Sequence, residues 1–206
     1  MTENFYRWFA VVIFLAGAGI STYFRRKADR IGGDRISAKA EGLPIMISLR
    51  LFGLTLWLGV ILYLINPTWM GWSQFEAPAW FRLTGAGLGF LADIFAYWVF
   101  SHLGKNVTQT VITRSNHQLV ADGPYRWIRH PLYTMGFLAY LSFSMLAANW
   151  YTAGMAVVLF LILNFRVPME ESKLIERFGE EYRLYMNRTG RYLPKLRWGL
   201  EAESKS

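Results

Sequence analysis

The sequence predicts an all-α, polytopic membrane protein that crosses the bilayer with five helices. Hydrophobic residues make up 53% of the 206 residues, and charged residues only 17%. Several apolar runs approach the roughly 20 residues that a helix needs to cross a bilayer. No loop between these runs is long enough to hold a separate soluble domain. We therefore expect a single integral membrane domain over residues 1–206.

Residues 1–100 are expected to supply the first three spans. The first covers residues 5–24, and a basic Arg25-Arg26-Lys27 segment follows it where a signal peptide would have a small-residue cleavage site. The second covers residues 44–65, because Pro44 suits a first helical turn and Asn66-Pro67 ends the pattern. The following loop, residues 66–80, is rich in tryptophan, as is typical of a membrane interface.

The third span is predicted over residues 82–103. Gly85, Gly87 and Gly89 near its start would allow close contact with another helix. Asp93 lies within this span, where an ionisable side chain is costly. Two interpretations stay open: a buried polar partner in a functional site, or a position in helix packing or at the interface.

Residues 101–198 are expected to hold the last two spans and the polar segments beside them. Residues 131–148 and 151–165 read as an antiparallel pair of short spans joined by a tight turn at Asn149. Residues 169–187 carry Leu174, Ile175, Phe178 and Tyr182 at helical spacing, which predicts an amphipathic helix on the membrane surface. Residues 199–206 are expected to be a disordered tail.

The distribution of Lys and Arg predicts the orientation. Residues 25–39, residues 104–130 and the C-terminal segment are basic, whereas residues 66–80 contain neither Lys nor Arg. Five spans with the N-terminus outside place every basic segment in the cytoplasm. The C-terminus and the polar motifs described next would then also lie on the cytoplasmic side.

Composition excludes several classes of function. The net charge of +8 would suggest nucleic acid as a partner for a soluble protein, but here the excess is better explained by topology. The absence of cysteine excludes disulfides, thiolate nucleophiles and Cys-ligated metals. With only three histidines and no HExxH motif, we expect neither a metal site nor nucleic-acid binding.

Two polar motifs flank the last apolar hairpin. HQLVADGPYRWIRHPLY occupies residues 117–133, and RVPMEESKL occupies residues 166–174. Charged groups are expensive near lipid, so both favour a site. The simpler alternatives are an interfacial belt of aromatic and arginine side chains and an exposed Arg166–Glu170 ion pair of a few tenths of a kcal/mol. Pro168 between these two residues could kink the helix and open a cavity for a ligand.

Together these segments resemble the isoprenylcysteine carboxyl methyltransferase family of integral membrane enzymes, which is similar in this region to the phospholipid N-methyltransferases. The shared patterns are HxLVxxGPYxxxRHPxY at residues 117–133, RxPxEExxL at residues 166–174 and FGxEYxxYxxxxxRxxP at residues 178–194. The resemblance extends over residues 100–195 and implies that residues 101–198 form a cofactor-binding catalytic core. The first two predicted spans match only in being apolar.

The resemblance implies S-adenosylmethionine as the methyl donor, with S-adenosylhomocysteine as the product, in a pocket on the cytoplasmic side. It assigns Arg166 to the substrate and, with Glu170, to catalysis. The implied cofactor contacts are Thr110, His117, Gln118, Leu119, Val120, Tyr125, His130, Pro131, Leu132, Tyr133 and Glu170. Whether Glu170 or Glu171 makes the main contact is left open by the motif.

The residue types suit this chemistry. The faces of Tyr125 and Tyr133 would attract the sulfonium cation of the donor. An ionised carboxylate needs no general base, so the protein would mainly position it and exclude water. The favoured reaction is carboxyl methylation of a lipid-linked substrate such as a prenylated cysteine. The alternatives are N-methylation of a phospholipid headgroup and a non-catalytic binding or scaffold protein with this fold.

Overall fold

The computed structural model describes residues 2–31, 43–103 and 119–195. The described chain is helical, with two isolated β-bridges and no strand. Its elements are α1 (Glu3–Ile31), α2 (Leu43–Ile65), η2 (Pro67–Ser73), α3 (Ala79–Leu103), η4 (Gly123–Arg126), α4 (Pro131–Ala147), α5 (Trp150–Phe178) and α6 (Glu180–Arg188). The all-α prediction is confirmed.

The long helices have the length and surface of membrane spans. Among the described residues, α1, α2, α3 and α5 are each long and apolar enough to cross a bilayer, and α4 is a shorter apolar helix of 17 residues. Large apolar side chains lie exposed on their outer faces, among them Leu54, Ile94 and Phe165. Soluble monomers rarely expose apolar surface on this scale, so these faces are suited to lipid. That all five helices cross the membrane stays a prediction.

Several predicted helix boundaries were too narrow. Helix α1 continues to Ile31 through the basic Arg25–Lys27 segment, and α3 begins at Ala79 rather than at Arg82. Hydropathy marks the part of a helix that suits lipid, whereas backbone hydrogen bonding extends the helix beyond it. Arg and Lys are good helix formers, so they do not end α1.

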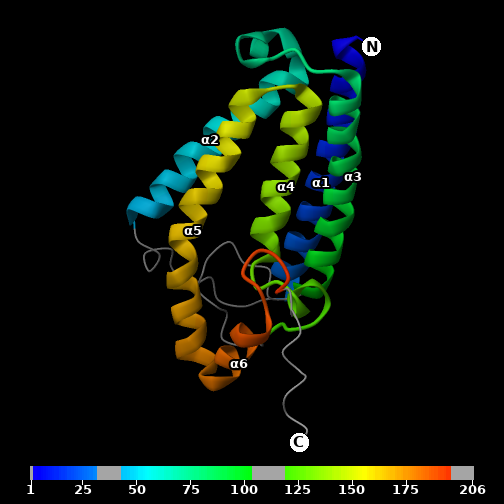
Figure 1. The fold of residues 1–206 in the computed structure, drawn as a ribbon. Coiled ribbons are helices and arrows are strands. Elements are labelled where there is room, and N and C mark those ends of the chain that lie inside the picture. The colour runs from blue at the N-terminus through cyan, green and yellow to red at the C-terminus, as the bar shows by residue number, and fades with distance from the viewer. Residues whose placement is uncertain (1, 32–42, 104–118, 196–206) are drawn as a thin grey trace, which may run out of the picture.

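The segment predicted as one amphipathic helix over residues 169–187 is helical, but its predicted bounds are wrong. Helix α5 continues without a break through Pro168 to Phe178, and the short α6 follows. The break lies at Gly179, whose φ of +56° is a left-handed conformation that glycine adopts without strain. Pro168 lacks a backbone N–H donor, and a proline inside a helix produces a bend rather than an end here. The ribbon of α5 changes direction in its lower half (Figure 1).

Glycine lets α3 and α4 approach closely. A Cβ atom at Gly85 would lie 2.5 Å from the backbone nitrogen of Leu146 in α4, whereas one at Gly89 would lie 2.9 Å from the Ile13 side chain in α1. These small residues therefore act as predicted for two of the three glycines. By contrast, a Cβ at Gly87 would meet nothing within 4 Å.

A buried polar cluster ties the helices together at the end of the bundle that holds Glu3. The Arg82 guanidinium donates two hydrogen bonds of 2.7 Å to the Glu3 carboxylate and lies 3.7 Å from the centre of the Tyr6 ring. Tyr63 donates to the same carboxylate at 2.8 Å. Asn149, at the α4–α5 turn, donates a 2.7 Å hydrogen bond to the Ser73 hydroxyl of η2. This end of the bundle is closed by the contacts of its own side chains.

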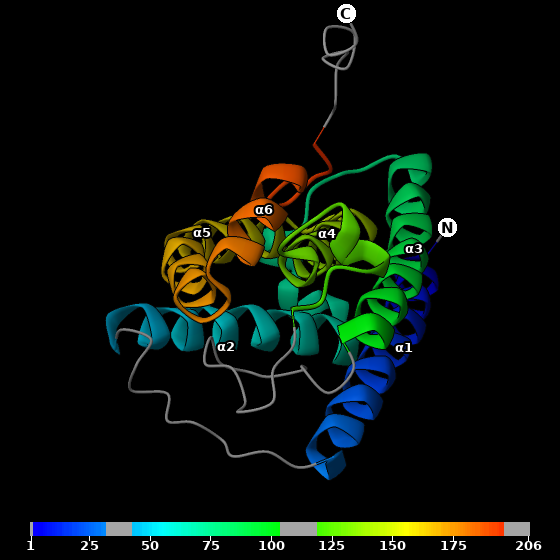
Figure 2. The ribbon, with the colours of Figure 1, turned by 90° about the horizontal axis from the view of Figure 1, so that it is seen from below.

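The opposite end of the bundle is arranged differently. Helices α1 and α3 lie side by side, α4 lies near the centre, and α5 packs against α2 and α4 (Figure 1). Seen from below, α1 and α2 diverge, with α4 and α5 above them (Figure 2). Element α6 and the segment after it lie at this lower end, together with η4. The sequence motifs therefore meet where the first two helices separate.

Candidate functional site

A cavity of about 700 Å³ occupies the lower half of the bundle. Its volume lies in the range of roughly 300–1,000 Å³ that is typical of small-molecule and cofactor sites. One part of its wall is apolar and comes from α1, α2, α3 and α4, for example Phe14, Trp57, Ala96 and Phe143. The other part carries the polar side chains of the motif segments. The cavity thus joins a polar end to an apolar interior.

Glu171 is the centre of a buried ionic network at the polar end. Only 4% of the residue is exposed. Its carboxylate accepts hydrogen bonds from Arg129 Nε at 2.9 Å and from Arg191 Nη2 at 2.8 Å, and His130 Nε2 lies 3.4 Å away. These three partners belong to the loop before α4 and to the segment after α6. Glu171 therefore holds three separate parts of the chain together.

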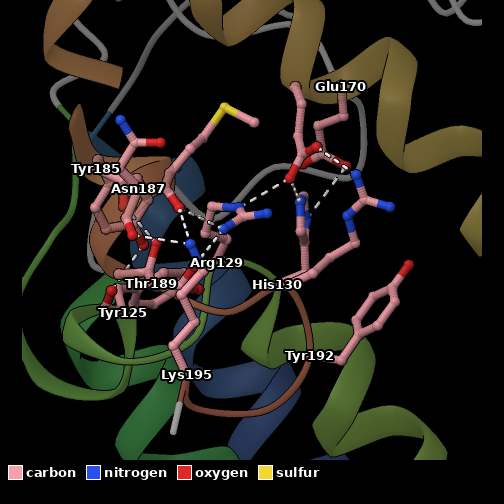
Figure 3. Close-up of polar contacts among 12 residues, drawn as sticks. Tyr125, Arg129, His130, Glu170, Tyr185, Asn187, Thr189, Tyr192 and Lys195 are labelled. Carbon is pink, nitrogen blue, oxygen red and sulfur yellow. Dashed lines mark hydrogen bonds and ion pairs between the residues drawn. The ribbon is translucent and has the colours of Figure 1, made fainter. Parts of the chain in front are cut away.

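Backbone pairing joins the same two segments. Arg129 N donates to Gly190 O at 2.8 Å, and His130 N donates to Arg191 O at 3.0 Å. The Arg129 guanidinium also donates to the carbonyls of Met186 and Thr189, at the end of α6 (Figure 3). A Cβ at Gly190 would lie 1.8 Å from the Leu193 carbonyl, so this turn has room only for glycine. The C-terminal segment is thus fixed against the loop that carries His130.

Glu170 lies one residue before Glu171, but its side chain faces the cavity rather than the ionic network. It lines the cavity, and its Oε2 accepts a hydrogen bond of 2.7 Å from the Tyr133 hydroxyl. The His130 ring stacks on the Tyr133 ring, with centroids 5.4 Å apart and planes 8° apart. His130 Nδ1 lies 3.9 Å from the same Glu170 oxygen. Since a carboxylate can accept about four hydrogen bonds, Glu170 keeps acceptor capacity for a ligand.

Tyr125 forms another wall of the polar end. The Gly123-Pro124 turn begins η4, and Gly123 has a φ of +52° and abuts the His102 ring, where a Cβ would not fit. The Tyr125 carbonyl accepts a 2.7 Å hydrogen bond from the Tyr185 hydroxyl. Burial, together with the nearby Tyr185 and Glu170, raises the pKa of the Tyr125 phenol. Its hydroxyl therefore stays protonated, and it has no hydrogen-bond partner within the described ranges.

Arg166 lies four residues before Glu170 on the same helix, and both line the cavity. The Arg166 guanidinium is close enough to the Tyr133 hydroxyl to interact with it electrostatically. A guanidinium, a carboxylate and two phenols therefore surround one end of the cavity. Such a set of groups could hold a zwitterionic or anionic ligand by charge-assisted hydrogen bonds.

The structure brings most of the predicted site residues together. The cavity is lined by Leu119, Val120, Tyr125, His130, Pro131, Leu132, Tyr133, Arg166 and Glu170. Thr110, His117 and Gln118 lie outside the described residues. Of the two neighbouring glutamates, Glu170 faces the cavity and Glu171 faces the structural network.

Sequence reasoning missed several residues that shape the site. Arg129 and Arg191 were not assigned a role, although both hold Glu171. Their position inside the shared motifs was the only available signal. The α1 wall of the cavity, which includes Gly17, Ser21 and Arg25, had no signal in the sequence. Within residues 2–31, 43–103 and 119–195, no group of three or more His, Cys, Asp or Glu could hold a metal ion.

Comparisons with known proteins agree with this geometry. Residues 86–176 match the sequence model of the isoprenylcysteine carboxyl methyltransferase (ICMT) family. The chain is 32% identical over 96 residues to protein-S-isoprenylcysteine O-methyltransferase of Schizosaccharomyces pombe, covering 45% of this chain and 41% of the relative. The corresponding protein of Saccharomyces cerevisiae is 34% identical over 98 residues, covering 46% and 38%. The chain thus spans less than half the length of these relatives.

A solved structure shares the fold. The eukaryotic intramembrane Ras methyltransferase ICMT, solved without a monobody, superposes with a TM-score of 0.55 at 22% sequence identity. The match covers 71% of this chain and 52% of that one. Residues 86–176, which include α4 and the cavity-lining residues Arg166 and Glu170, match the family's sequence model. Residues 86–176 are therefore similar in sequence to the ICMT family, and the chain shares the fold of a solved ICMT.

Proposed function

We propose that this protein transfers a methyl group from S-adenosylmethionine to the carboxylate of a lipid-linked acceptor, with a prenylated cysteine as the favoured class. One observation carries the proposal: a single cavity joins a polar end, lined by Tyr125, Tyr133, Arg166 and Glu170, to an apolar interior between the helices. A charged donor and a lipid-like acceptor need these two environments side by side.

The residues at the polar end fit the methyl donor. The Glu170 carboxylate has unused acceptor capacity for the ammonium of the donor's amino-acid part. The Tyr125 hydroxyl is buried on the cavity wall, has no hydrogen-bond partner among the described residues, and can donate or accept a bond to the ligand. Tyr133 presents an aromatic ring, which attracts cations, and Leu119 and Val120 offer an apolar surface for the adenine. When bound, the donor supplies an electrophilic methyl group on a sulfonium.

Arg166 is assigned to the acceptor. A guanidinium can hold a carboxylate with two parallel hydrogen bonds, which fixes the direction of the attacking oxygen. With a pKa of about 4, that carboxylate is ionised at neutral pH and needs no general base. The protein's own contribution is then to orient the two ligands and to keep water away from them.

The proposed orientation places this site on the cytoplasmic side. The end of α1 that lies at the site carries Arg25, Arg26, Lys27 and Arg30, whereas the opposite loop at residues 66–80 has no basic residue. Positive charge near span ends favours the cytoplasm. The donor then enters from the cytoplasm, and the acceptor's apolar part lies within the bilayer-embedded half of the cavity.

The test uses the purified full-length protein in nanodiscs. Donor binding is measured by calorimetry, and transfer of a labelled methyl group is measured against a prenylcysteine analogue, a free isoprenoid acid and phosphatidylethanolamine. We expect Glu170→Ala and Tyr133→Ala to weaken donor binding. Arg166→Ala should leave donor binding largely intact and reduce turnover of the carboxylate acceptors. Glu176→Ala is the matched control, because Glu176 is exposed on the same helix and does not line the cavity.

Two results would contradict the proposal. Methylation of phosphatidylethanolamine alone would establish headgroup N-methylation in place of carboxyl methylation. Failure of the wild-type protein to bind the donor would leave a non-catalytic membrane protein with this fold. Loss of donor binding in a folded Arg166→Ala variant would overturn the division of roles between Arg166 and Glu170.

A further inference from the structure

Asp93 is a second polar feature of the cavity, far from the polar end. It lies ten residues before the end of α3 at Leu103, which is about 15 Å of helix. It lines the same cavity as Arg166 and Glu170. Its Oδ2 atom is buried, and no group in the described part of the chain gives it a hydrogen bond. An ionisable side chain at this depth in a membrane protein is costly and points to a function.

Helix α1 is shaped to accept this carboxyl group. A Cβ atom at Gly17 would lie 2.7 Å from Asp93 Oδ1, so any larger residue there would push the carboxyl group away. Ser21 and Arg25 follow Gly17 at four-residue steps, line the same cavity and are joined by a 3.1 Å hydrogen bond from Arg25 Nε. The face of α1 formed by Gly17, Ser21 and Arg25 is therefore polar or lacks a side chain between the polar end of the cavity and Asp93.

The position of Asp93 along the cavity follows from helix packing. Gly89, one turn earlier on α3, lies beside Ser142 of α4. Since α3 and α4 run in opposite directions, Asp93 is level with the region of Ala139. Ala139 lies six residues after Tyr133, or about 9 Å along α4. Asp93 thus lies roughly 10 Å deeper than the polar end, beside the apolar part of the cavity.

We infer that Asp93 accepts a hydrogen bond from an O–H or N–H group on the tail of the acceptor. This inference rests on the proposed function, because it places the acceptor's tail in the inner half of the cavity. A plain prenyl chain is hydrocarbon and would leave the carboxyl group without a partner. The acceptor class is therefore a lipid-like carboxylate with a hydroxyl or amino group roughly 10 Å from its methylated end.

The experiment compares the binding of four amphiphiles to the full-length protein in nanodiscs. All four have the same chain length and one carboxylate, and they carry a hydroxyl, an amine, a methyl ether or no substituent roughly 10 Å from it. We expect the hydroxyl and amine compounds to bind at least about 10-fold tighter than the other two, since each can donate to a carboxylate. The methyl ether keeps the oxygen but has no proton to donate.

Three variants test whether Asp93 causes this preference. Asp93→Leu should abolish it for both compounds. Asp93→Asn keeps an acceptor oxygen without charge, so it should keep the hydroxyl preference and lose most of the amine's advantage. Gly17→Ala should weaken the preference by displacing an unchanged carboxyl group. Donor binding should stay at the wild-type value in all three, which shows that the cavity is folded.

The inference is overturned if the four amphiphiles bind equally to the wild type, if none binds, or if the preference survives Asp93→Leu. Because binding is measured without turnover, this result is independent of the methyl transfer assay. Selective binding without methylation of any acceptor would count against the proposed function and leave the role of Asp93 standing. Methylation of a plain prenylcysteine, with no tighter binding of the hydroxyl and amine compounds, would support the proposed function and count against the role of Asp93.

Discussion

Exchanging the neighbouring residues Glu170 and Glu171 for glutamine should damage two different properties of the protein. Glu171→Gln removes the charge that holds Arg129 and Arg191, while it keeps the size of the side chain. Glu170→Gln removes a charge that faces the cavity and has one hydrogen bond, from Tyr133. The first change should lower stability, and the second should lower affinity for the donor.

The expected magnitudes follow from burial. The side chains of Arg129 and Glu171 are 9% and 5% exposed, and removing one partner of a buried ion pair costs about 3–5 kcal/mol. Glutamine retains one acceptor oxygen, so we expect the lower end, about 3 kcal/mol. For a chain of this length that corresponds to a Tm decrease of roughly 6–12 °C. The Glu170 side chain is 24% exposed, so its exchange should cost less than about 1 kcal/mol of stability.

The assay combines thermal unfolding in detergent with calorimetry of S-adenosylmethionine binding for both variants and the wild type. Glu170→Gln should bind the donor about 10- to 100-fold more weakly, because a charge-assisted hydrogen bond is lost, with Tm nearly unchanged. Glu171→Gln, measured well below its lowered Tm, should bind within a few-fold of the wild type. An unchanged Tm in Glu171→Gln, together with full donor affinity in Glu170→Gln, would refute the assignment of the two glutamates.

Three further predictions address orientation, chemistry and the C-terminal turn. The chain has no native cysteine, so single cysteines can be introduced at the exposed positions Glu76 and Glu180. A cysteine at position 76 should be labelled from outside and one at position 180 from the cytoplasmic side. Labelling of both from one side would contradict the five-span topology. Single-turnover carboxyl methylation should be nearly constant from about pH 6 to 8, since an acceptor carboxylate of ordinary pKa is ionised throughout that range, and Arg166→Lys should slow it by losing the forked hydrogen bonds. A rate that rises steeply with pH and an unaffected Arg166→Lys variant would instead favour an amine acceptor. Gly190→Ala should lower Tm by several degrees, because its Cβ would collide with the Leu193 carbonyl, whereas Gly87→Ala, in open space, should not; equal Tm values would show that the turn can adjust.

Hydropathy and composition predicted the helical class and the general position of the helices, because lipid demands long apolar segments with internal hydrogen bonds. The exact ends were not predictable in this way. Helix α5 continues through Pro168 into polar sequence, since one missing hydrogen bond bends a helix without ending it, and the left-handed Gly179 sets its true end. Local helix propensity alone does not show whether Pro168 or Gly179 ends the helix.

The cavity lining was predictable where its residues belong to the motifs that resemble the family, as Tyr133, Arg166 and Glu170 do. The role of Glu171 was not, because its partners Arg129 and Arg191 lie 42 and 20 residues away, and only folding brings them together. The same holds for Asp93, because its neighbour Gly17 lies on α1, two helices earlier in the sequence. Motif spacing gives no information about contacts with helices that carry no motif.

The origin of the cavity walls bears on how such a protein can change its acceptor over evolutionary time. The cavity-lining charged groups Arg166 and Glu170 lie within residues 86–176, where the family pattern is found, whereas α1 and α2 lie outside that range. These two helices contribute Phe14, Trp57 and Gly17 to the far wall. On the proposed function, mutations in these two helices can reshape the space for a lipid tail while the polar end of the cavity is untouched. The same polar end can then be combined with many different walls for the acceptor.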